Sequence, residues 1–384
     1  MYKIIIYFLL FTLSFSSEKI SIKKLKLSVK DKTTFATLDS LNNIGLDIKK
    51  DGDSFIITTD KGKLILNKNK IIAPHKKFTI ISSPFKSKDK DFLPLNIILT
   101  LNNYKLTDEF IVKNEKITTP KSYPTKVISL APGVTEKIFA LGAENLLIGR
   151  TKFSNYPKEV ENIDIVGTMF EPNLEIIVNK SPDIVIAETH FKDKLESSLN
   201  SFGIQVLKFQ TPKNILEIYD SIYKLGALLD RDLEARGLNA SLEDKVAYTK
   251  NILEDEKRPS VYYVLSSGKS DITAGGDTFI NSLIEISGGS NIASNKSGWS
   301  YSLEELILND PSIIFGSKRN IDNMLGEENY QQLSAIKNKN HFIIEDDSIF
   351  NLPGPRALTE GVYQMGKIFH PEKSKDLEKI RSIK

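Results

Sequence analysis

The sequence predicts an α/β protein with two doubly wound lobes joined by one long helix and preceded by a small α+β domain. Three observations lead to this prediction. From residue 126 onward, continuous apolar strands alternate with amphipathic helices, which is typical of a parallel sheet covered on both faces. One helix–proline–strand unit occurs twice. Residues 18–116 contain short segments of period-2 alternation, which indicate half-buried strands.

The amino-acid composition excludes several classes of function for this protein. A chain of 384 residues with 40% hydrophobic and 26% charged side chains is typical of soluble globular proteins with two or three domains. The net charge of +3, from 52 basic and 49 acidic side chains, gives no reason to expect a nucleic-acid partner. The absence of cysteine excludes disulfides, thiolate metal sites and thiol catalysis.

Residues 1–17 have the outline of a secretory signal peptide. An apolar run from Ile4 to Leu13 follows one lysine, and small residues stand at Ser16 and Ser17. The run is short for a membrane span, and an uncleaved anchor is the alternative. Because no cysteine is available for lipid attachment, we expect an unlipidated protein in the periplasm of an organism with two membranes.

Residues 18–116 are predicted to form a small α+β accessory domain. Two helical pieces, starting near Phe35 and Phe92, each lead into a strand and give a weak internal repeat. This pattern resembles the small N-terminal domain of copper amine oxidases, which also occurs as an accessory domain on exported bacterial proteins. No copper chemistry follows from the pattern, and the lone His75 is expected at the surface.

The remaining boundaries follow from prolines and from changes of periodicity. Residues 117–125 contain two prolines and are predicted to be a linker. The first lobe is predicted over 126–212, the linking helix over 213–258 and the second lobe over 259–384. The linking helix has one apolar face, and Gly237 is the position where a break is expected.

The repeated unit reads "PNLEIIVNKSPDIVIAE" in the first lobe and "YSLEELILNDPSIIFGS" in the second. A single offset of 129 residues aligns Glu175 with Glu304 and Pro182 with Pro311. In both copies a capping residue starts a short helix, the proline ends it, and a buried strand follows. The constant offset predicts that the lobes are structural copies of each other.

Glu175 and Glu304 fall in the first turns of these helices. Their charges stabilise the positive end of a helix dipole by roughly 0.3–1 kcal/mol each, which is the local explanation. The functional alternative requires a partner with two equivalent positive sites, such as a dimeric membrane permease.

From about Lys126 to Glu372 the chain is similar to substrate-binding proteins of ABC importers for iron chelates, haem and cobalamin. The resemblance rests on "VISLAPGVTEKIFALGA", "NYPKEVENIDIVGTMFEPNLEIIVNKSPDIVIAE" and "LPGPRALTEGVYQMGKIFHPE". It implies two lobes that clamp one small-molecule ligand, with no catalysis and no resident cofactor. It also implies that one glutamate on each lobe docks onto arginines of the permease dimer at the inner membrane. Glu175 and Glu304 match those positions.

Aromatic side chains in loops at the carboxyl ends of the strands suit a macrocyclic ligand, because flat rings bury much area at little entropic cost. The candidates are Tyr156, Phe170, Trp299 and Phe350, and each is alternatively a loop packing anchor. The "NYPKE" and "GTMF" loops and the neighbourhood of Trp299 most resemble the cobalamin binders. A corrinoid is therefore the first expectation for the ligand.

Haem and ferric siderophores are the alternatives within the same importer class. Met169 and His190 are side chains able to ligate haem iron. Lys269 and Arg356 are candidates for an anionic chelate, and Asp347 for a polar ligand edge. A bare metal site is not expected, because the four histidines are dispersed along the chain.

Two readings from other classes remain. A doubly wound enzyme is one, but the sequence has no G-x-S-x-G, P-loop, G-x-G-x-x-G or H-E-x-x-H motif. An exported adhesin or assembly factor that uses the accessory domain is the other. The sequence therefore favours a non-enzymatic binding protein.

Overall fold

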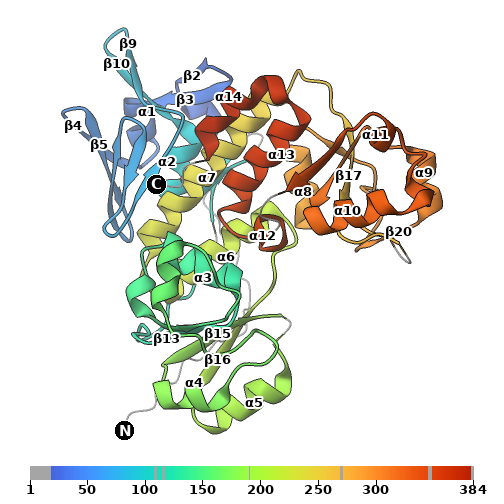
Figure 1. Cartoon of the computed structure of the whole chain (residues 1–384). Coiled ribbons are helices and arrows are strands. Elements are labelled where there is room, and N and C mark those ends of the chain that lie inside the picture. Colours follow the sequence, from blue (N-terminus) through green and yellow to red (C-terminus); the bar gives the residue numbers. More distant parts are fainter. Residues whose placement is uncertain are drawn as a thin grey trace. The chain divides into compact units, whose positions relative to one another are not determined.

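The computed structural model describes residues 19–107, 110–114, 117–189, 191–268, 271–344 and 348–381 (Figure 1). The predicted signal peptide lies outside these residues. The chain divides into two compact units: unit 1 comprises residues 1–211, 219–244 and 383–384, and unit 2 comprises 212–218 and 245–382. None of the described helices is both long enough and apolar enough to span a bilayer. The predicted α/β fold class is confirmed.

The described residues of the accessory domain form three antiparallel sheets with strand orders β1-β12-β11, β2-β3-β10-β9 and β4-β5-β6-β7-β8. Each of its two helices joins consecutive strands, as β3–α1–β4 and β10–α2–β11, which is the predicted internal repeat. The elements are β1 (Lys19–Ser21), β2 (Leu27–Lys30), β3 (Thr33–Thr37), α1 (Leu38–Asn43), β4 (Asp47–Asp51), β5 (Ser54–Thr59), β6 (Gly62–Asn67), β7 (Lys70–Ile72), β8 (Lys77–Thr79), β9 (Phe85–Ser87), β10 (Lys90–Pro94), α2 (Leu95–Leu101), β11 (Tyr104–Leu106) and β12 (Phe110–Lys113).

The accessory domain packs on the first part of helix α7 (Asp232–Leu253) within unit 1. The carboxylate of Asp244 accepts hydrogen bonds from the backbone N–H groups of Ile81 and Ser82, at 2.5 and 3.1 Å. The guanidinium of Arg236 contacts Asp60 at 2.7 Å. Asp244 and Arg236 are both buried, so breaking either contact would desolvate a charge without its partner on the accessory domain, and the two contacts favour one relative position of the surfaces.

The first lobe has a parallel sheet of order β14-β13-β15-β16. The chain starts in the interior strand β13, goes to one side for β14 and then to the other side for β15 and β16, which is the doubly wound arrangement. Its elements are β13 (Val127–Ser129), α3 (Pro132–Ala140), β14 (Leu147–Arg150), α4 (Leu174–Lys180), β15 (Ile184–Glu188), α5 (Asp193–Ser201) and β16 (Gln205–Phe209).

The second lobe repeats this topology, with a parallel sheet of order β19-β17-β21-β22. A short antiparallel pair, β18 with β20, is added beside it. The elements are β17 (Ser260–Val264), β18 (Asp271–Ile272), α8 (Phe279–Ile286), β19 (Ser290–Asn291), β20 (Ser300–Tyr301), α9 (Leu303–Asn309), β21 (Ile313–Ser317), α10 (Lys318–Gly326), α11 (Ser334–Lys337), β22 (His341–Ile344), α12 (Ser348–Asn351), α13 (Val362–Phe369) and α14 (Ser374–Leu377).

The repeated sequence unit corresponds to α4–β15 in the first lobe and to α9–β21 in the second. Asn173 caps α4 by accepting from the N–H of Ile176, and Ser302 caps α9 by accepting from the N–H of Glu305. Both helices end on a residue in the left-handed region, directly before the proline. The units match residue for residue, so the prediction of two copied lobes is confirmed.

The single linking helix predicted over 213–258 is wrong, because this part of the chain forms two helices, α6 (Ile215–Leu228) and α7. The chain turns between them at Asp230, which has a φ of 57°. The expected break at Gly237 is wrong, because α7 continues through this residue. A Cβ at this position would lie 2.7 Å from the ring of Phe78, so the glycine gives room to the accessory domain.

Candidate functional site

Exposed aromatic side chains gather on two loops of the first lobe, beyond the carboxyl end of β14. Tyr156 and Phe170 are 39% and 53% exposed. Phe153, which the sequence reasoning missed, is also 53% exposed and lies on the same loop as Tyr156. The N–H of Lys152 donates to the carbonyl of Gly167 at 2.9 Å, so the two loops are hydrogen-bonded to each other. The signal that could have identified Phe153 was an aromatic residue three positions after the end of β14.

Buried hydroxyl groups support the loop that carries Tyr156. The hydroxyl of Thr135, on α3, contacts the hydroxyls of Ser129 at 2.9 Å and Ser154 at 3.1 Å. Arg150, at the end of β14, donates to the carbonyl oxygens of Ser154 and Ile163, both at 3.0 Å. This network joins the strand ends to the loop, so the exposed rings lie on a supported backbone.

Met169 and Phe170 lie at the tip of a tight turn. Gly167 has a φ of 111°, and a Cβ there would lie 2.6 Å from the carbonyl oxygen of Glu171. The hydroxyl of Thr168 accepts from the N–H of Glu171 at 2.9 Å and closes the turn. The side chain of Met169 is half-buried beside the exposed ring.

Trp299 is the exposed aromatic of the second lobe, at 46% exposure, and it directly precedes β20. Its carbonyl accepts from the N–H of Thr273 at 2.9 Å. Asp277 holds the same loop by accepting from the N–H of Gly298 at 2.7 Å and from the hydroxyl of Ser297. Unit 2 thus presents Trp299 on a loop fixed from two sides.

A buried acid–phenol pair lies next to this loop. The hydroxyl of Tyr330 donates to the carboxylate of Asp271 at 2.6 Å and accepts from the N–H of Gly268 at 2.8 Å. Burial raises the pKa of Asp271, and burial together with the Asp271 carboxylate raises the pKa of Tyr330 to about 12. Both groups hydrogen-bond within unit 2, so the pair supports the β18 segment.

The first lobe also contains buried charges at the carboxyl end of β15 that the sequence reasoning missed. Lys137, on α3, is fully buried, and burial lowers its pKa while the carboxylates of Glu188 and Glu136 oppose that change. Glu188 ends the apolar strand and is itself 8% exposed. The sequence signal that could have identified Glu188 was a glutamate at the end of an apolar strand.

Two predicted ligand contacts lie in the interior of unit 2. Phe350, on α12, is fully buried and its ring centroid lies 6.3 Å from that of Tyr263. Arg356 is 7% exposed and donates to the hydroxyl of Ser348 at 3.3 Å. The side chain of Phe350 packs in the core because α12 turns its apolar side inward. His190, Lys269 and Asp347 lie outside the described residues.

Glu175 and Glu304 are exposed at the starts of α4 and α9. In the described part of the chain neither carboxylate takes part in an ion pair. The neighbouring Glu305 differs, because Lys296 and the cap residue Ser302 hold it and lower its pKa. Among the described residues, the carboxylates at these two equivalent positions are therefore not neutralised by an ion pair.

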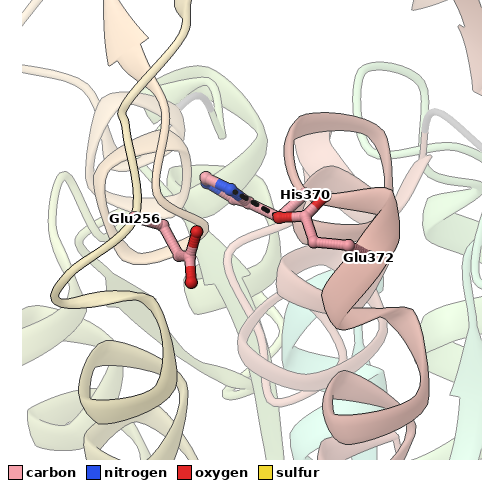
Figure 2. Close-up of side chains that lie close together, drawn as sticks. All are labelled: Glu256, His370 and Glu372. Atoms are coloured by element: carbon pink, nitrogen blue, oxygen red, sulfur yellow. Dashed lines mark ion pairs between the residues drawn. The ribbon is translucent and has the colours of Figure 1, made fainter.

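Glu256, His370 and Glu372 each place one possible metal-ligand atom within 4.8 Å of the others (Figure 2). Buried His370 has its Nε2 3.2 Å from the carbonyl of Gly288 and its Nδ1 3.5 Å from Glu372. The ammonium of Lys373 already lies 2.8 Å from the carboxylate of Glu256. We therefore describe the group as an ion-pair cluster that joins the end of α7 to the C-terminal helices within unit 2.

Unit 2 also has an open cavity of about 640 Å³. Its walls come from the end of α7 and the residues that follow it, from α8 and from β19, and include Lys250, Glu254 and Arg258. None of the described predicted contact residues lines it. Arg258 donates to the carbonyls of Glu285 and Gly289, so its guanidinium already hydrogen-bonds to the protein backbone.

The chain matches known proteins over much of its length. The model of the family described as periplasmic binding protein matches residues 127–348. An ABC transporter substrate-binding lipoprotein of Bacillus subtilis is 29% identical over 272 residues, which are 68% of this chain and 85% of that protein. A vitamin B12-binding protein of Vibrio vulnificus is 30% identical over 241 residues, 61% of this chain and 86% of that protein. A crystal structure of a possible iron-binding protein from Staphylococcus epidermidis has a TM-score of 0.59 and 26% identity, and covers 65% of this chain and all of that one.

Proposed function

Because the chain belongs to the periplasmic binding protein family and is a substrate-binding protein of an ABC importer, we propose that its ligand is a corrinoid. Proteins similar to this chain are named for binding vitamin B12, iron and haem. Among these ligands we choose the corrinoid because of the shape and chemistry of the exposed loops.

The grouping of Phe153, Tyr156 and Phe170 carries the proposal. Three large rings, each between 39% and 53% exposed, lie on two loops that are hydrogen-bonded to each other. Exposed aromatic rings on a supported backbone gain contact area with a flat macrocycle and lose little conformational entropy. The relative from Vibrio vulnificus that is named for vitamin B12 binding supports the same choice.

The test measures binding of cyanocobalamin, haemin and a ferric siderophore in parallel, by visible absorbance and by quenching of the tryptophan fluorescence. Trp299 is the only tryptophan of the chain, so any quenching reports on one loop of the second lobe. We expect tightest binding for cyanocobalamin. We also expect Phe170→Ala to weaken it by roughly tenfold, from the loss of one aromatic contact.

Phe202 provides the matched control. It is a phenylalanine of the same lobe, 62% exposed, and it follows α5 at the opposite, amino-terminal side of the strands. Phe202→Ala should bind like the wild type. Tighter binding of haemin than of cyanocobalamin would contradict the corrinoid proposal and indicate that the protein serves a haem importer. Absence of binding to all three probes at micromolar concentration would contradict the proposal.

Glu175 and Glu304 are proposed to dock onto basic side chains of a permease dimer. Both are exposed and sit at equivalent positions of two copied lobes. A partner with two equivalent subunits presents the same positive group twice, which fits this repetition. Charges of this kind add specificity and association rate.

We further propose that the protein is exported, acts in a periplasm and releases its ligand chemically unchanged. The signal-like segment 1–17 and the kinship with substrate-binding proteins support export. Cell fractionation tests the location, and recovery of intact cyanocobalamin after incubation tests the absence of catalysis. A modified corrinoid in that experiment would contradict the non-enzymatic assignment.

A further inference from the structure

We propose that the accessory domain binds the surface of an anionic lipid bilayer through a basic, partly apolar patch around strand β2. The patch consists of Lys23, Lys24, Lys26, Leu27, Val29 and Lys30, and is called the β2 patch below. This inference does not depend on which ligand the lobes bind.

Charge is distributed unevenly along the chain. Residues 18–116 contain 20 lysines and 12 acidic side chains, a net charge of +8, although the whole chain carries only +3. The rest of the chain therefore has a net charge of −5. The near-neutral total conceals a strongly basic domain, and such a domain is attracted to anionic surfaces.

The lysines are densest in one stretch. Residues 23–32 contain five lysines and one acidic residue, Asp31. All five lysines are exposed. In the described part of the chain, Lys23, Lys24, Lys26 and Lys30 form no ion pair, and Lys30 lies over the ring of Phe85 at 5.0 Å. Among the described residues, the positive charges of these four lysines are thus not neutralised by an ion pair.

Two apolar side chains stand exposed among these lysines. Leu27 and Val29 are 43% and 68% exposed, and they lie on the same face of β2 because they are two residues apart. Strand β2 is at the edge of its sheet and pairs only with β3. Natural edge strands usually carry charge to prevent association, and here the lysines Lys26 and Lys30 flank the apolar pair along the strand and alternate with it between the two faces.

This combination fits a membrane surface better than a free polyanion. Lysines near an anionic leaflet gain electrostatic energy, and apolar side chains gain by entering the boundary between head groups and acyl chains. A dissolved polyanion such as polyphosphate uses the lysines but offers nothing to Leu27 and Val29. The aliphatic pair therefore favours the lipid surface as the partner.

The experiment is sedimentation of the exported protein with vesicles of neutral phosphatidylcholine, with and without 30 mol% phosphatidylglycerol. We expect binding only to the anionic vesicles and a loss of binding at high salt. Replacing Lys23, Lys24, Lys26 and Lys30 by glutamine should lower the partition coefficient by about six hundred-fold, at roughly fivefold for each lysine. Leu27→Ser with Val29→Ser should lower it further at unchanged charge.

The control variant changes four exposed lysines of the same domain on its other large sheet, namely Lys49, Lys63, Lys68 and Lys70, to glutamine. It has the same net charge as the patch variant and should retain most of the binding. Equal losses in both variants would overturn the proposal, because binding would then follow net charge alone. Competition by polyphosphate combined with no effect of the serine variant would also overturn it, and would assign the patch to a soluble polyanion. Circular dichroism confirms that each variant is folded.

Discussion

The hydroxyl of Thr100, at the end of α2, donates a hydrogen bond of 2.5 Å to the carboxylate of Glu243 on α7. The two residues are 143 positions apart and belong to the accessory domain and to the linking helix. Burial raises the pKa of Glu243 to about 7, and the bond from Thr100 opposes this only in part. The carboxyl of Glu243 therefore changes its protonation state near neutral pH, at the contact between α2 and α7.

Glu243 is expected to make the stability of unit 1 depend on pH. Because its folded pKa of about 7 exceeds the ordinary value of 4.5, the native state binds more protons than the unfolded state between these values. The urea midpoint should therefore fall as pH rises from about 4.5 to 7, by an amount equivalent to about 3 kcal/mol, and level off above.

Glu243→Gln removes this titration while keeping an acceptor for Thr100. The variant should match the wild type near pH 4.5 and unfold at higher urea at pH 8, as followed by circular dichroism across that range. Glu159→Gln, at an exposed position of the same unit, serves as the control. If the wild type and Glu243→Gln keep the same separation at every pH, the titration does not belong to this carboxyl.

Gly237→Ala should destabilise the contact between the accessory domain and α7. The added Cβ would lie 2.7–2.8 Å from two ring atoms of Phe78. Overpacking of this kind costs about 1–3 kcal/mol, against a gain of about 1 kcal/mol in helix propensity. Thermal unfolding measures the change. Combining it with Phe78→Leu should recover part of the loss, whereas Gly326→Ala, where a Cβ meets open space, should have little effect. A neutral Gly237→Ala would mean that the ring moves away without cost.

Gly167→Ala tests the turn that carries Met169 and Phe170. Its φ of 111° and the 2.6 Å approach of the Glu171 carbonyl oblige the loop to change shape. We expect cyanocobalamin affinity to fall by at least roughly tenfold while the unfolding temperature changes little, since the loop is exposed. Gly203→Ala has a comparable φ of 78° but no steric conflict, and it should bind normally. Unchanged affinity in Gly167→Ala would remove this turn from the ligand site.

Charge reversal tests the docking role of the two glutamates. Glu175→Lys and Glu304→Lys should each reduce uptake of labelled cobalamin by cells, and together abolish it, because an attractive contact becomes repulsive. Affinity in solution should stay the same. Glu159→Lys and Glu328→Lys change exposed acids on the same two lobes and should transport normally. Normal uptake by the double Glu175/Glu304 variant would contradict the docking role.

Features that depend on neighbours in the sequence were predicted well. Asn173 and Ser302 cap their helices, Pro182 and Pro311 follow the last turns, and the strands begin where the apolar runs begin. Capping, proline geometry and hydrophobic periodicity act within a few residues, so one sequence contains the necessary information. The equivalence of the lobes followed from the constant offset for the same reason.

The sequence by itself thus determined the element types, the two copied lobes and the loops from which candidate contacts come. Only the tertiary structure decided which loop residues face solvent: Phe153 was exposed beside Tyr156, while Phe350 and Arg356 were buried. It also decided that Gly237 continues a helix and that Glu243 meets Thr100. These outcomes depend on atoms more than a hundred residues away in the chain, or on the packing of a whole lobe. Local periodicity contains no information about contacts between residues that are far apart in the chain. Those contacts determine the burial and the pKa of a side chain.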